Sequence, residues 1–437
     1  MDAAVLEAYG LFHDQGWLAD RALERVIRRE RRLFAAERRA VAEAVFGLVR
    51  WRGQLEWLMG DGRALLGEAA GVPAAAPRPG PAALYALWLA RSGAPPGEAA
   101  RRLGVPPAAL VALEGAGGRV AAVADPLARL AVEQSIPRWV VRRLAAERGE
   151  AEARALLAAL NARAPLTVRA NLLRGSREEL RDRLAAEGAV ASPTAHSPWG
   201  LVLDGHANAF ALPSFRAGWF EIQDEGSQLL ALATGARPGR KVVDACAGAG
   251  GKSLALAMEM RNRGDLFALD VDEGRLGEAR RRARRAGVHN LRFRLLPPGA
   301  EADAALRDLA GVADRVLVDA PCSGLGALRR RPDTRWRLRP GEPESFAATQ
   351  RELCARFARL VRPGGRLLYA TCALFRTENE EVAAFLAAEA PGLQPLPMAA
   401  ALGEDRARAL AAPGHELTLL PHLHGTDGFY AALFERK

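Results

Sequence analysis

The sequence predicts a multidomain protein that ends in an α/β domain with a mostly parallel sheet. The chain has 437 residues, which is more than one hydrophobic core usually serves. Short apolar stretches alternate with helical patterns from Lys241 onward, an order typical of parallel sheets covered by helices. The first part of the chain shows only helical periodicity, and strand-like stretches begin near residue 160. We therefore predict an all-helical domain over 1–140, a small α+β module over 141–220 and the α/β domain over 221–437.

The N-terminal region has the pattern of amphipathic helices. Over residues 21–58, apolar side chains recur every three or four positions between arginine-rich faces. A proline-rich break follows at 67–82, and the helical pattern resumes from Ala83. The basic run Arg25–Arg39 could contact RNA, although a solvated helix face explains it equally well.

The middle region mixes strand and helix signals. The stretch PLTVRANLL at 165–173 predicts a strand, and SREELRDRLAAEG at 176–188 predicts a helix with a capped start. Two further strands are predicted by GLVLDG at 200–205 and WFEIQ at 219–223, with a loop at 192–200. These elements indicate a small α+β module.

The C-terminal region alternates between the two element types. Strands are expected at 241–245, 265–270, 291–296, 315–320, 366–370 and 429–434. Helices are expected at about 253–260, 272–286, 303–309, 344–361 and 378–389. Such an order favours a mostly parallel sheet with helices on both faces, and ligands of such sheets bind beyond the carboxyl ends of the strands.

Composition narrows the classes of protein that are possible. No window has 18 or more consecutive apolar residues, and the N-terminus lacks the basic start and apolar core of a secretory signal, so we expect a soluble cytoplasmic protein without a membrane partner. None of the four cysteines forms a C-x-x-C pair, so no metal site is expected. The net charge is +10, but only three basic residues are lysines, which points to biased base composition. Arginine abundance is therefore weak evidence for nucleic acid, and the clustering of charge is better evidence.

A glycine-rich turn, DACAGAGGKS, follows the first strand of the α/β domain at 244–253. It departs from the nucleotide P-loop pattern at Cys246, and from the dinucleotide pattern at Ser253, where each pattern requires glycine. Its glycines still let the backbone approach a ligand closely, and the following helix presents free N–H groups. We interpret it as a turn for a nucleotide-like cofactor; the alternative is a βα turn without a ligand.

Polar and sulfur-bearing residues end the next strands. Asp270 ends the second strand about 20 residues after the turn, where an acid can bind ribose hydroxyls, unless it is only a solvated loop acid or a helix cap. Cys322 and Cys372 each follow a later strand, so they would meet at the crevice if those strands are neighbours. Cys246 could lie close to them, whereas Cys354 sits within a helical pattern and suits packing.

Two thiols beside a nucleotide-like cofactor suit methylation of a pyrimidine ring. A thiolate that adds to C6 makes C5 nucleophilic toward an electrophilic methyl group, and a base must then remove the C5 proton so that the thiol can leave. Asp319, three residues before Cys322, is placed to hydrogen-bond to the ring at N3 and stabilise charge in the adduct.

The motifs that carry this chemistry resemble those of a known family. DACAGAGGK, DAPCSG, RRRPDTRW, LVRPGGRLLYATC and GTDGFYAALFERK are similar, in order, to the motif series of the RNA cytosine-5 methyltransferases. The match is best with the branch that modifies small-subunit (16S) ribosomal RNA. The helical region resembles the NusB-like RNA-binding domain of that branch, and the middle region resembles its RRM-like module.

The resemblance implies a Rossmann-like class I methyltransferase domain, S-adenosylmethionine as methyl donor and ribosomal RNA as partner. It implies that Cys372 attacks C6 and that Cys322 assists product release. Asp270 corresponds to the acid that binds the ribose. Asp319 corresponds to the aspartate of the DAPC motif and is expected to be both a catalytic and a cofactor-binding residue. The cofactor loop corresponds to Cys246, Ala247, Gly248, Ala249, Gly250, Gly251 and Lys252.

Two positions depart from the family pattern. Gly248 and Ala249 stand where the family loop reads Ala-Pro. Pro297 and Pro298 follow the third strand, where the family has an aspartate near the adenine. Either recognition of the adenine differs in this chain, or its affinity for the cofactor is lower.

The basic stretch LRRRPDTRWRLRP at 328–340 follows the DAPCSG loop. It could bind phosphate and stack on a base, or it could be a solvated charged loop. The predicted RNA contacts are Arg329, Arg330, Arg331, Arg335 and Trp336.

Alternatives to this function differ in class. A transfer RNA substrate would keep the chemistry, whereas a non-catalytic RNA-binding assembly factor would have a degenerate cofactor site. An amino-group methyltransferase would favour a [DNS]-P-P-[FYW] signature where this chain has DAPC. We expect a monomer.

Overall fold

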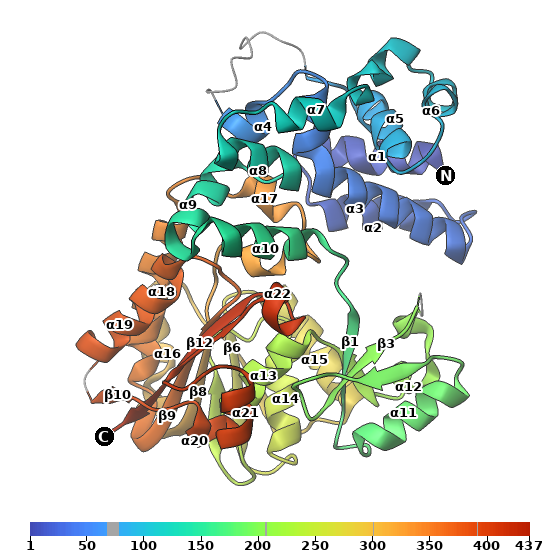
Figure 1. Ribbon diagram of the computed structural model, residues 1–437. Helices are drawn as coiled ribbons and strands as arrows, with labels where there is room; N and C mark the ends of the chain where they lie inside the picture. Colours follow the sequence, from blue (N-terminus) through green and yellow to red (C-terminus); the bar gives the residue numbers. More distant parts are fainter. Residues whose placement is uncertain (68–77, 206–207, 300, 391) are drawn as a thin grey trace. The chain divides into compact units, whose positions relative to one another are not determined.

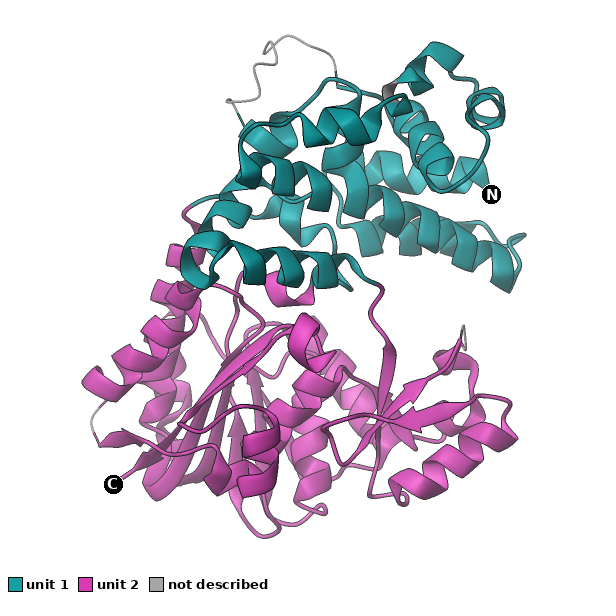
Figure 2. Cartoon of the chain, in the orientation of Figure 1, with its two compact units in different colours: residues 1–162, 328–340 teal, residues 163–327, 341–437 magenta. Residues whose placement is uncertain are grey.

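The structure is a computed structural model that describes residues 1–67, 78–205, 208–299, 301–390 and 392–437. It divides into two compact units (Figure 2). Unit 1 comprises Met1–Ala162 and Leu328–Pro340, and unit 2 comprises Arg163–Ala327 and Gly341–Lys437. The predicted break at 67–82 lies mostly outside the described residues.

Unit 1 is built from helices, as predicted (Figure 1). Its core contains Tyr9, Leu48, Leu55 and Tyr85, which are almost completely buried. The predicted division at residue 140 remains a prediction; in the structure the compact unit continues to Ala162. The helices of this unit are α1 Asp2–His13, α2 Ala19–Arg29, α3 Ala35–Leu58, α4 Arg63–Leu66, α5 Pro81–Arg91, α6 Pro96–Leu103, η2 Pro107–Leu113, α7 Ala116–Ala121, α8 Pro126–Gln134, α9 Arg138–Arg148, α10 Glu150–Asn161 and α17 Thr334–Arg337.

Unit 2 begins with a small antiparallel sheet of four strands in the order β2-β3-β1-β4. The capped helix predicted from the sequence is present, because the Ser176 hydroxyl accepts from the Glu179 amide and the Glu179 carboxylate accepts from the Ser176 amide. The elements of this module are β1 Leu166–Ala170, α11 Arg177–Ala186, β2 Ala191–Pro193, β3 Gly200–Leu203, η3 Ala209–Ala211, α12 Pro213–Arg216 and β4 Phe220–Ile222.

The rest of unit 2 is an α/β domain around an eight-stranded sheet. The strand order is β10-β12-β9-β8-β5-β6-β7, and β11 pairs with β12. The five strands from β7 to β9 are parallel, and β12 runs antiparallel to β9. The strands are β5 Lys241–Asp244, β6 Asp265–Asp270, β7 Leu291–Leu295, β8 Ala313–Asp319, β9 Val361–Thr371, β10 Leu393–Pro395, β11 Glu416–Leu419 and β12 Phe429–Arg436.

Helices cover both faces of this sheet (Figure 1). Side chains alternate along β5, so Val242 packs in one cluster with Leu256 of α14, and Val243 packs in the other with Phe357 of α18. The helices are α13 Glu225–Ala233, α14 Gly251–Glu259, α15 Glu273–Ala286, α16 Glu301–Ala305, η4 Arg307–Leu309, η5 Leu325–Ala327, α18 Glu342–Ala358, η6 Arg376–Glu378, α19 Glu380–Glu389, α20 Ala399–Leu402, α21 Glu404–Ala409 and α22 Pro421–His424.

The strand order reverses at β5, which has β8 on one side and β6 on the other. In open parallel sheets, this reversal leaves a crevice outside the carboxyl ends of the strands. The ends of β5, β6, β8 and β9 are therefore the place where a ligand site is expected.

Candidate active site

The glycine-rich turn connects β5 to α14 at the point where the strand order reverses. Gly248 has φ +54° and Gly250 has φ +80°, which side-chain-bearing residues rarely adopt. A Cβ atom on Gly250 would lie 2.8 Å from the Cβ of Ala279, so this position also has no room for a side chain. The Gly248 amide donates to Asp270 Oδ2 over 2.7 Å, and this bond fastens the turn to the end of β6.

Asp270 ends β6 with its carboxylate only slightly exposed. Its Oδ1 accepts from the Asp272 amide over 2.9 Å, and its Oδ2 accepts from Gly248. Each carboxylate oxygen can accept a second hydrogen bond, so the group can still bind ribose hydroxyls. A Cβ atom on Gly248 would meet no atom within 4 Å, so there is open space beside the turn. These residues fit a nucleotide-like cofactor.

Asp244, the last residue of β5, is buried beneath the turn. Its Oδ2 accepts from the Ser253 hydroxyl over 2.6 Å. Burial raises the pKa of this carboxyl to about 7, because removal from water disfavours its charged form. Asp244 therefore supports the turn from inside the sheet.

The two thiols that follow β8 and β9 lie side by side. These strands are parallel neighbours, with Asp319 in register with Ala370. The Sγ atoms of Cys322 and Cys372 are 3.2 Å apart, and the Cys372 amide donates to Cys322 Sγ over 3.3 Å. Both residues are partly exposed. The pair is therefore open to a substrate at the carboxyl ends of the strands.

The other two cysteines lie in different surroundings. Cys354 is fully buried in α18, and burial raises the pKa of its thiol. Cys246 is partly exposed in the glycine-rich turn, but burial of its sulfur also raises its pKa. Neither thiol is therefore favoured as a thiolate.

The environment of the thiol pair favours one sulfur as the thiolate. The hydrogen bond from Cys322 lowers the pKa of Cys372, and the positive charge of Lys252 acts in the same direction, against burial and the Asp319 charge. The same hydrogen bond, with burial, raises the pKa of Cys322. The thiolate is the reactive form of cysteine, so Cys372 is the better nucleophile of the two.

An ion pair lies beside the thiols. Lys252, in the first turn of α14, places its Nζ 2.7 Å from Oδ2 of Asp319 at the end of β8. Burial opposes the charge on Lys252, but Asp319 outweighs it and raises the pKa of the ammonium group. The Asp319 side chain is 30% exposed and its Oδ1 has no hydrogen bond to any described residue, so this oxygen can meet a substrate.

Four buried polar residues around the thiols were missed by the sequence analysis: Gln350, Tyr369, Glu378 and Asn379. Their hydrogen bonds lead to the residues on either side of the two cysteines. The only signal in the sequence is a polar pair, Glu378-Asn379, soon after the second cysteine, and nothing there indicated that it is buried.

The basic stretch 328–340 folds into unit 1, where two of its predicted RNA contacts are occupied. The Arg335 guanidinium is fully buried and donates to Asn161 Oδ1 over 2.8 Å and to the Ser135 carbonyl over 3.2 Å. The Trp336 indole donates to the Val49 carbonyl over 2.6 Å. Arg335 thus caps the C-terminal ends of α8 and α10, where helix dipoles favour a cation.

This placement changes which residues of the stretch can meet RNA. Arg335 and Trp336 donate their hydrogen bonds to groups within unit 1. Arg329 is also buried, Arg330 is half-buried and Arg331 is exposed. Contact of the stretch with RNA remains a prediction that concerns its exposed members.

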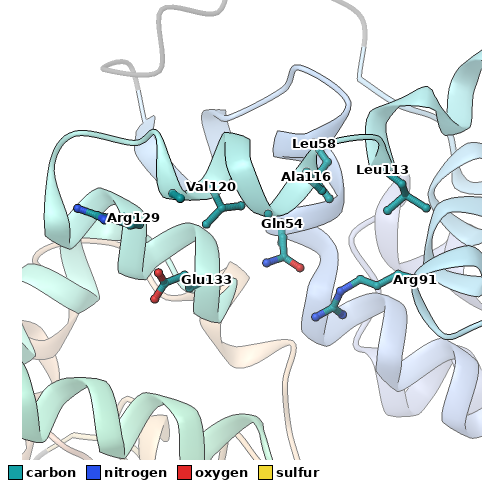
Figure 3. A pocket seen from close by; sticks show the side chains of 10 residues that line it. Gln54, Leu58, Arg91, Leu113, Ala116, Val120, Arg129 and Glu133 are labelled. Atoms are coloured by element: carbon teal, nitrogen blue, oxygen red, sulfur yellow. The ribbon is translucent and has the colours of Figure 1, made fainter.

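A cavity of about 430 Å³ lies in unit 1, and none of the predicted site residues lines it (Figure 3). Its lining includes Gln54, Leu58, Arg91, Val120 and Glu133. Among the described residues, no group of three or more His, Cys, Asp or Glu side chains is placed to hold a metal ion. No helix in the described part of the chain is long and apolar enough to cross a membrane.

The fold and the site together define a Rossmann-like class I methyltransferase. The sheet reverses at β5, a glycine-rich turn and an acid follow β5 and β6, and a thiol pair follows β8 and β9. Comparison with known proteins identifies the family. Residues 230–435 match the family model of 16S rRNA methyltransferase RsmB/F, and residues 136–209 match the ferredoxin-like domain of the same proteins.

Relatives with known names agree with this match. The chain is 33% identical over 323 residues to the probable ribosomal RNA small subunit methyltransferase B of Bacillus subtilis strain 168, covering 72% of this chain and 70% of the relative. It is 35% identical over 308 residues to ribosomal RNA small subunit methyltransferase B of Pseudomonas putida, covering 70% and 67%. The chain therefore belongs to the RsmB/F family.

Two solved structures share the fold. The crystal structure of PH0851 superimposes with a TM-score of 0.79 at 25% identity, covering 99% of this chain and 98% of that one. A methyltransferase homolog protein from Pyrococcus horikoshii gives a TM-score of 0.60 at 26% identity, covering 72% and 100%. Family membership makes this chain an S-adenosylmethionine-dependent RNA cytosine-5 methyltransferase, with a ferredoxin-like middle module. The amino-group and non-catalytic alternatives are thereby set aside.

Proposed function

We propose that this chain forms 5-methylcytosine in 16S ribosomal RNA, with Cys372 as nucleophile and Cys322 assisting release of the product. The observation that carries the proposal is the 3.2 Å separation of the two sulfurs, both partly exposed at the ends of neighbouring parallel strands. The relatives named as small-subunit ribosomal RNA methyltransferases support the choice of ribosomal RNA over transfer RNA as the substrate.

The first step is addition of Cys372 to the ring. Its thiolate forms a bond to C6, and the electron pair of the C5–C6 double bond moves onto C5 and toward N3. Asp319 lies at the end of β8, beside the thiols, and has one oxygen held by Lys252. With a proton taken up from solvent, its other oxygen can donate a hydrogen bond to N3, which carries no hydrogen in cytosine, and this bond would stabilise the charge that develops there.

S-adenosylmethionine, when bound, supplies the electrophilic methyl group that C5 accepts. The residues of this chain that would hold it are the turn Cys246–Lys252 and Asp270. Recognition of the adenine lacks an acid after β7. Val271 and Leu295 are exposed side chains next to the ends of β6 and β7, and they suit an apolar contact with the adenine ring.

The last step releases the product. A base takes the proton from C5, the electron pair of that C–H bond re-forms the C5–C6 double bond, and the bond between C6 and Cys372 breaks. Cys322 is protonated at rest because its hydrogen bond to Cys372 and its burial raise its pKa. Once Cys372 is a thioether, it no longer carries the charge that opposes ionisation of Cys322. Cys322 can then lose its proton to solvent, and its thiolate can accept the proton from C5.

Variants of the two cysteines test this assignment on unmodified 16S ribosomal RNA transcribed in vitro. Cys372→Ala is expected to abolish methyl transfer and to give no covalent protein–RNA adduct. Cys322→Ala is expected to allow addition and to stall release, so that the adduct accumulates on a denaturing gel. Cys354→Ala, which removes a thiol that is fully buried in α18, is the matched control and should turn over normally.

The outcomes that overturn the proposal are distinct. Normal turnover by Cys372→Ala would exclude it as the nucleophile, and an adduct formed only through Cys322 would reverse the two roles. Bisulfite sequencing of ribosomal and transfer RNA from cells with and without the protein identifies the substrate. Loss of a modified cytosine in transfer RNA alone would replace 16S ribosomal RNA in the proposal.

A further inference from the structure

The backbone on both sides of Cys322 is held by buried side chains. Gln350 of α18 donates through Nε2 to the Pro321 carbonyl over 2.9 Å. Glu378 accepts the Ser323 amide at Oε1 over 2.8 Å. Gln350 Nε2 also lies 3.3 Å from the same Glu378 oxygen, so the two side chains form one network. The peptide units before and after Cys322 are thus fixed by one buried pair, and the direction of its Cα–Cβ bond is fixed with them.

Asn379, the residue after Glu378, bonds in a similar way to the residues on both sides of Cys372. Asn379 accepts the Thr371 hydroxyl at Oδ1 over 2.6 Å and donates through Nδ2 to the Ala373 carbonyl over 3.3 Å. The Ala373 amide in turn donates to the Thr371 hydroxyl oxygen over 3.2 Å. The residues before and after Cys372 are therefore both tied to one side chain.

Glu378 and Asn379 themselves are held rigidly. Both are buried to within 1% exposure; Glu378 ends η6, and Asn379 connects it to α19. The Tyr369 hydroxyl, on β9, lies 2.5 Å from the Glu378 carbonyl and 3.0 Å from Gln350 Oε1. Two adjacent residues whose own positions are fixed are thus bonded to two loops that belong to different strands.

We infer that the dipeptide Glu378-Asn379 is a positioning element that sets the separation of the two catalytic sulfurs. Glu378, with Gln350, positions Cys322 for release, and Asn379 positions Cys372 for addition. The inference rests on the proposed function, since it assigns the hydrogen bonds of each residue to one chemical step. It adds residues that do not touch the substrate but determine where the reacting atoms lie.

The charge of Glu378 supports this assignment. After the hydrogen bond to Cys372 and burial, the Glu378 carboxylate is among the causes that raise the pKa of Cys322. It therefore helps to keep Cys322 protonated while Cys372 adds to the ring. One side chain thus contributes both the position and the protonation state of the release cysteine.

Replacing Glu378 and replacing Asn379 should impair different steps of the reaction. A purely structural role would lower the rate without this distinction between addition and release. Glu378→Ala leaves the Ser323 amide without its acceptor, so Cys322 shifts; we expect adduct to accumulate as in Cys322→Ala. Asn379→Ala loosens the backbone at Cys372, so we expect slow addition with no excess adduct. A misplacement near 1 Å costs about 100-fold in rate, and we expect kcat to fall about 10- to 100-fold in both variants.

Three further variants complete the design. Thr377→Val removes the neighbouring hydrogen bond to Glu381, which does not reach either cysteine loop, and is the matched control. Glu378→Gln keeps an oxygen acceptor for the Ser323 amide and should restore most of the release rate. Gln350→Met removes the donor to the Pro321 carbonyl with a side chain of similar size, and should also accumulate adduct.

The readouts are covalent adduct on a denaturing gel, kcat and KM on 16S ribosomal RNA transcribed in vitro, and the melting temperature of each variant. If Glu378→Ala does not fold, Gln350→Met decides the question for Cys322. The inference is overturned if Glu378→Ala or Gln350→Met gives no more adduct than Thr377→Val, or if Asn379→Ala accumulates adduct. If Cys372→Ala still turns over in the same assays, the proposed function fails instead.

Discussion

Gly326 lies where the loops of the two thiols meet, and replacing it should disturb both. Its amide donates to the Cys372 carbonyl over 2.8 Å, and its carbonyl accepts from the Gly428 amide over 2.9 Å. A Cβ atom at this position would lie 2.1 Å from the Gly428 carbonyl oxygen and 2.9 Å from that of Cys372. These atoms belong to the backbone, so they cannot move aside as a flexible side chain can.

The size of the effect follows from these contacts. Gly326→Ala must push the backbone of Gly428 away by more than 1 Å to reach an ordinary contact. Two hydrogen bonds, worth about 1 kcal/mol each, are strained or lost, and overpacking adds about 1–3 kcal/mol. We expect a loss of about 3–5 kcal/mol in the free energy of unfolding of unit 2. For a unit of this size, that loss corresponds to a fall of roughly 5–9 °C in its melting temperature.

Differential scanning fluorimetry and a methyl-transfer assay check this prediction. Gly277→Ala, in the interior of α15, is the control, because its Cβ would meet only the end of Arg281 at 3.9 Å. Removing a helical glycine there should stabilise the protein by about 1 kcal/mol. For Gly326→Ala we also expect kcat to fall about 100-fold through displacement of Cys372. Equal melting temperatures and rates for the two variants would refute the reasoning.

Three more predictions concern charge. Burial raises the pKa of Asp244 to about 7, above its value in the unfolded chain, so the folded state binds an extra proton. The free energy of unfolding therefore falls as pH rises from about 4 to about 7. Asp244→Asn should flatten the dependence of melting temperature on pH in that window, and an unchanged slope would contradict this prediction. The Lys252 charge helps to lower the pKa of Cys372, so Lys252→Met should move the acid limb of the pH–rate profile to higher pH, and a limb that stays in place would exclude this role. Arg335→Ala leaves buried carbonyl groups unpaired and should destabilise unit 1 by about 1–3 kcal/mol in thermal unfolding, whereas the exposed Arg337→Ala should not; equal effects would show that the buried bonds contribute little.

Local sequence was sufficient for the elements that carry the site. The six strands predicted in the α/β domain are all present, because each is an apolar run bounded by turn residues. The two strands that were not predicted, β10 and β11, have three and four residues, too few to show alternation. Cys322 and Cys372 were placed after strands by the same runs, since the end of a strand is a local property of the chain.

Arg335, in the basic stretch 328–340, shows what local reasoning does not decide. Its arginines and tryptophan match the composition of an RNA contact, and the sequence contains nothing that distinguishes this from packing. Arg335 is buried because it meets the ends of two helices that lie 174 and 200 residues away along the chain. Composition describes what a side chain can bind, whereas its partner is chosen by the packing of distant segments.

The sequence by itself determined the type and order of the elements, the glycine-rich turn after β5 and the position of the two thiols after strands. These depend on periodicity and residue type over a few positions, which together fix the local conformation of the backbone. Only the tertiary structure decided that the sulfurs are 3.2 Å apart and that Glu378 and Asn379 hold their loops. A separation of that kind is set by hydrogen bonds between residues that share no local pattern, so it exists only once the sheet and its helices have packed together.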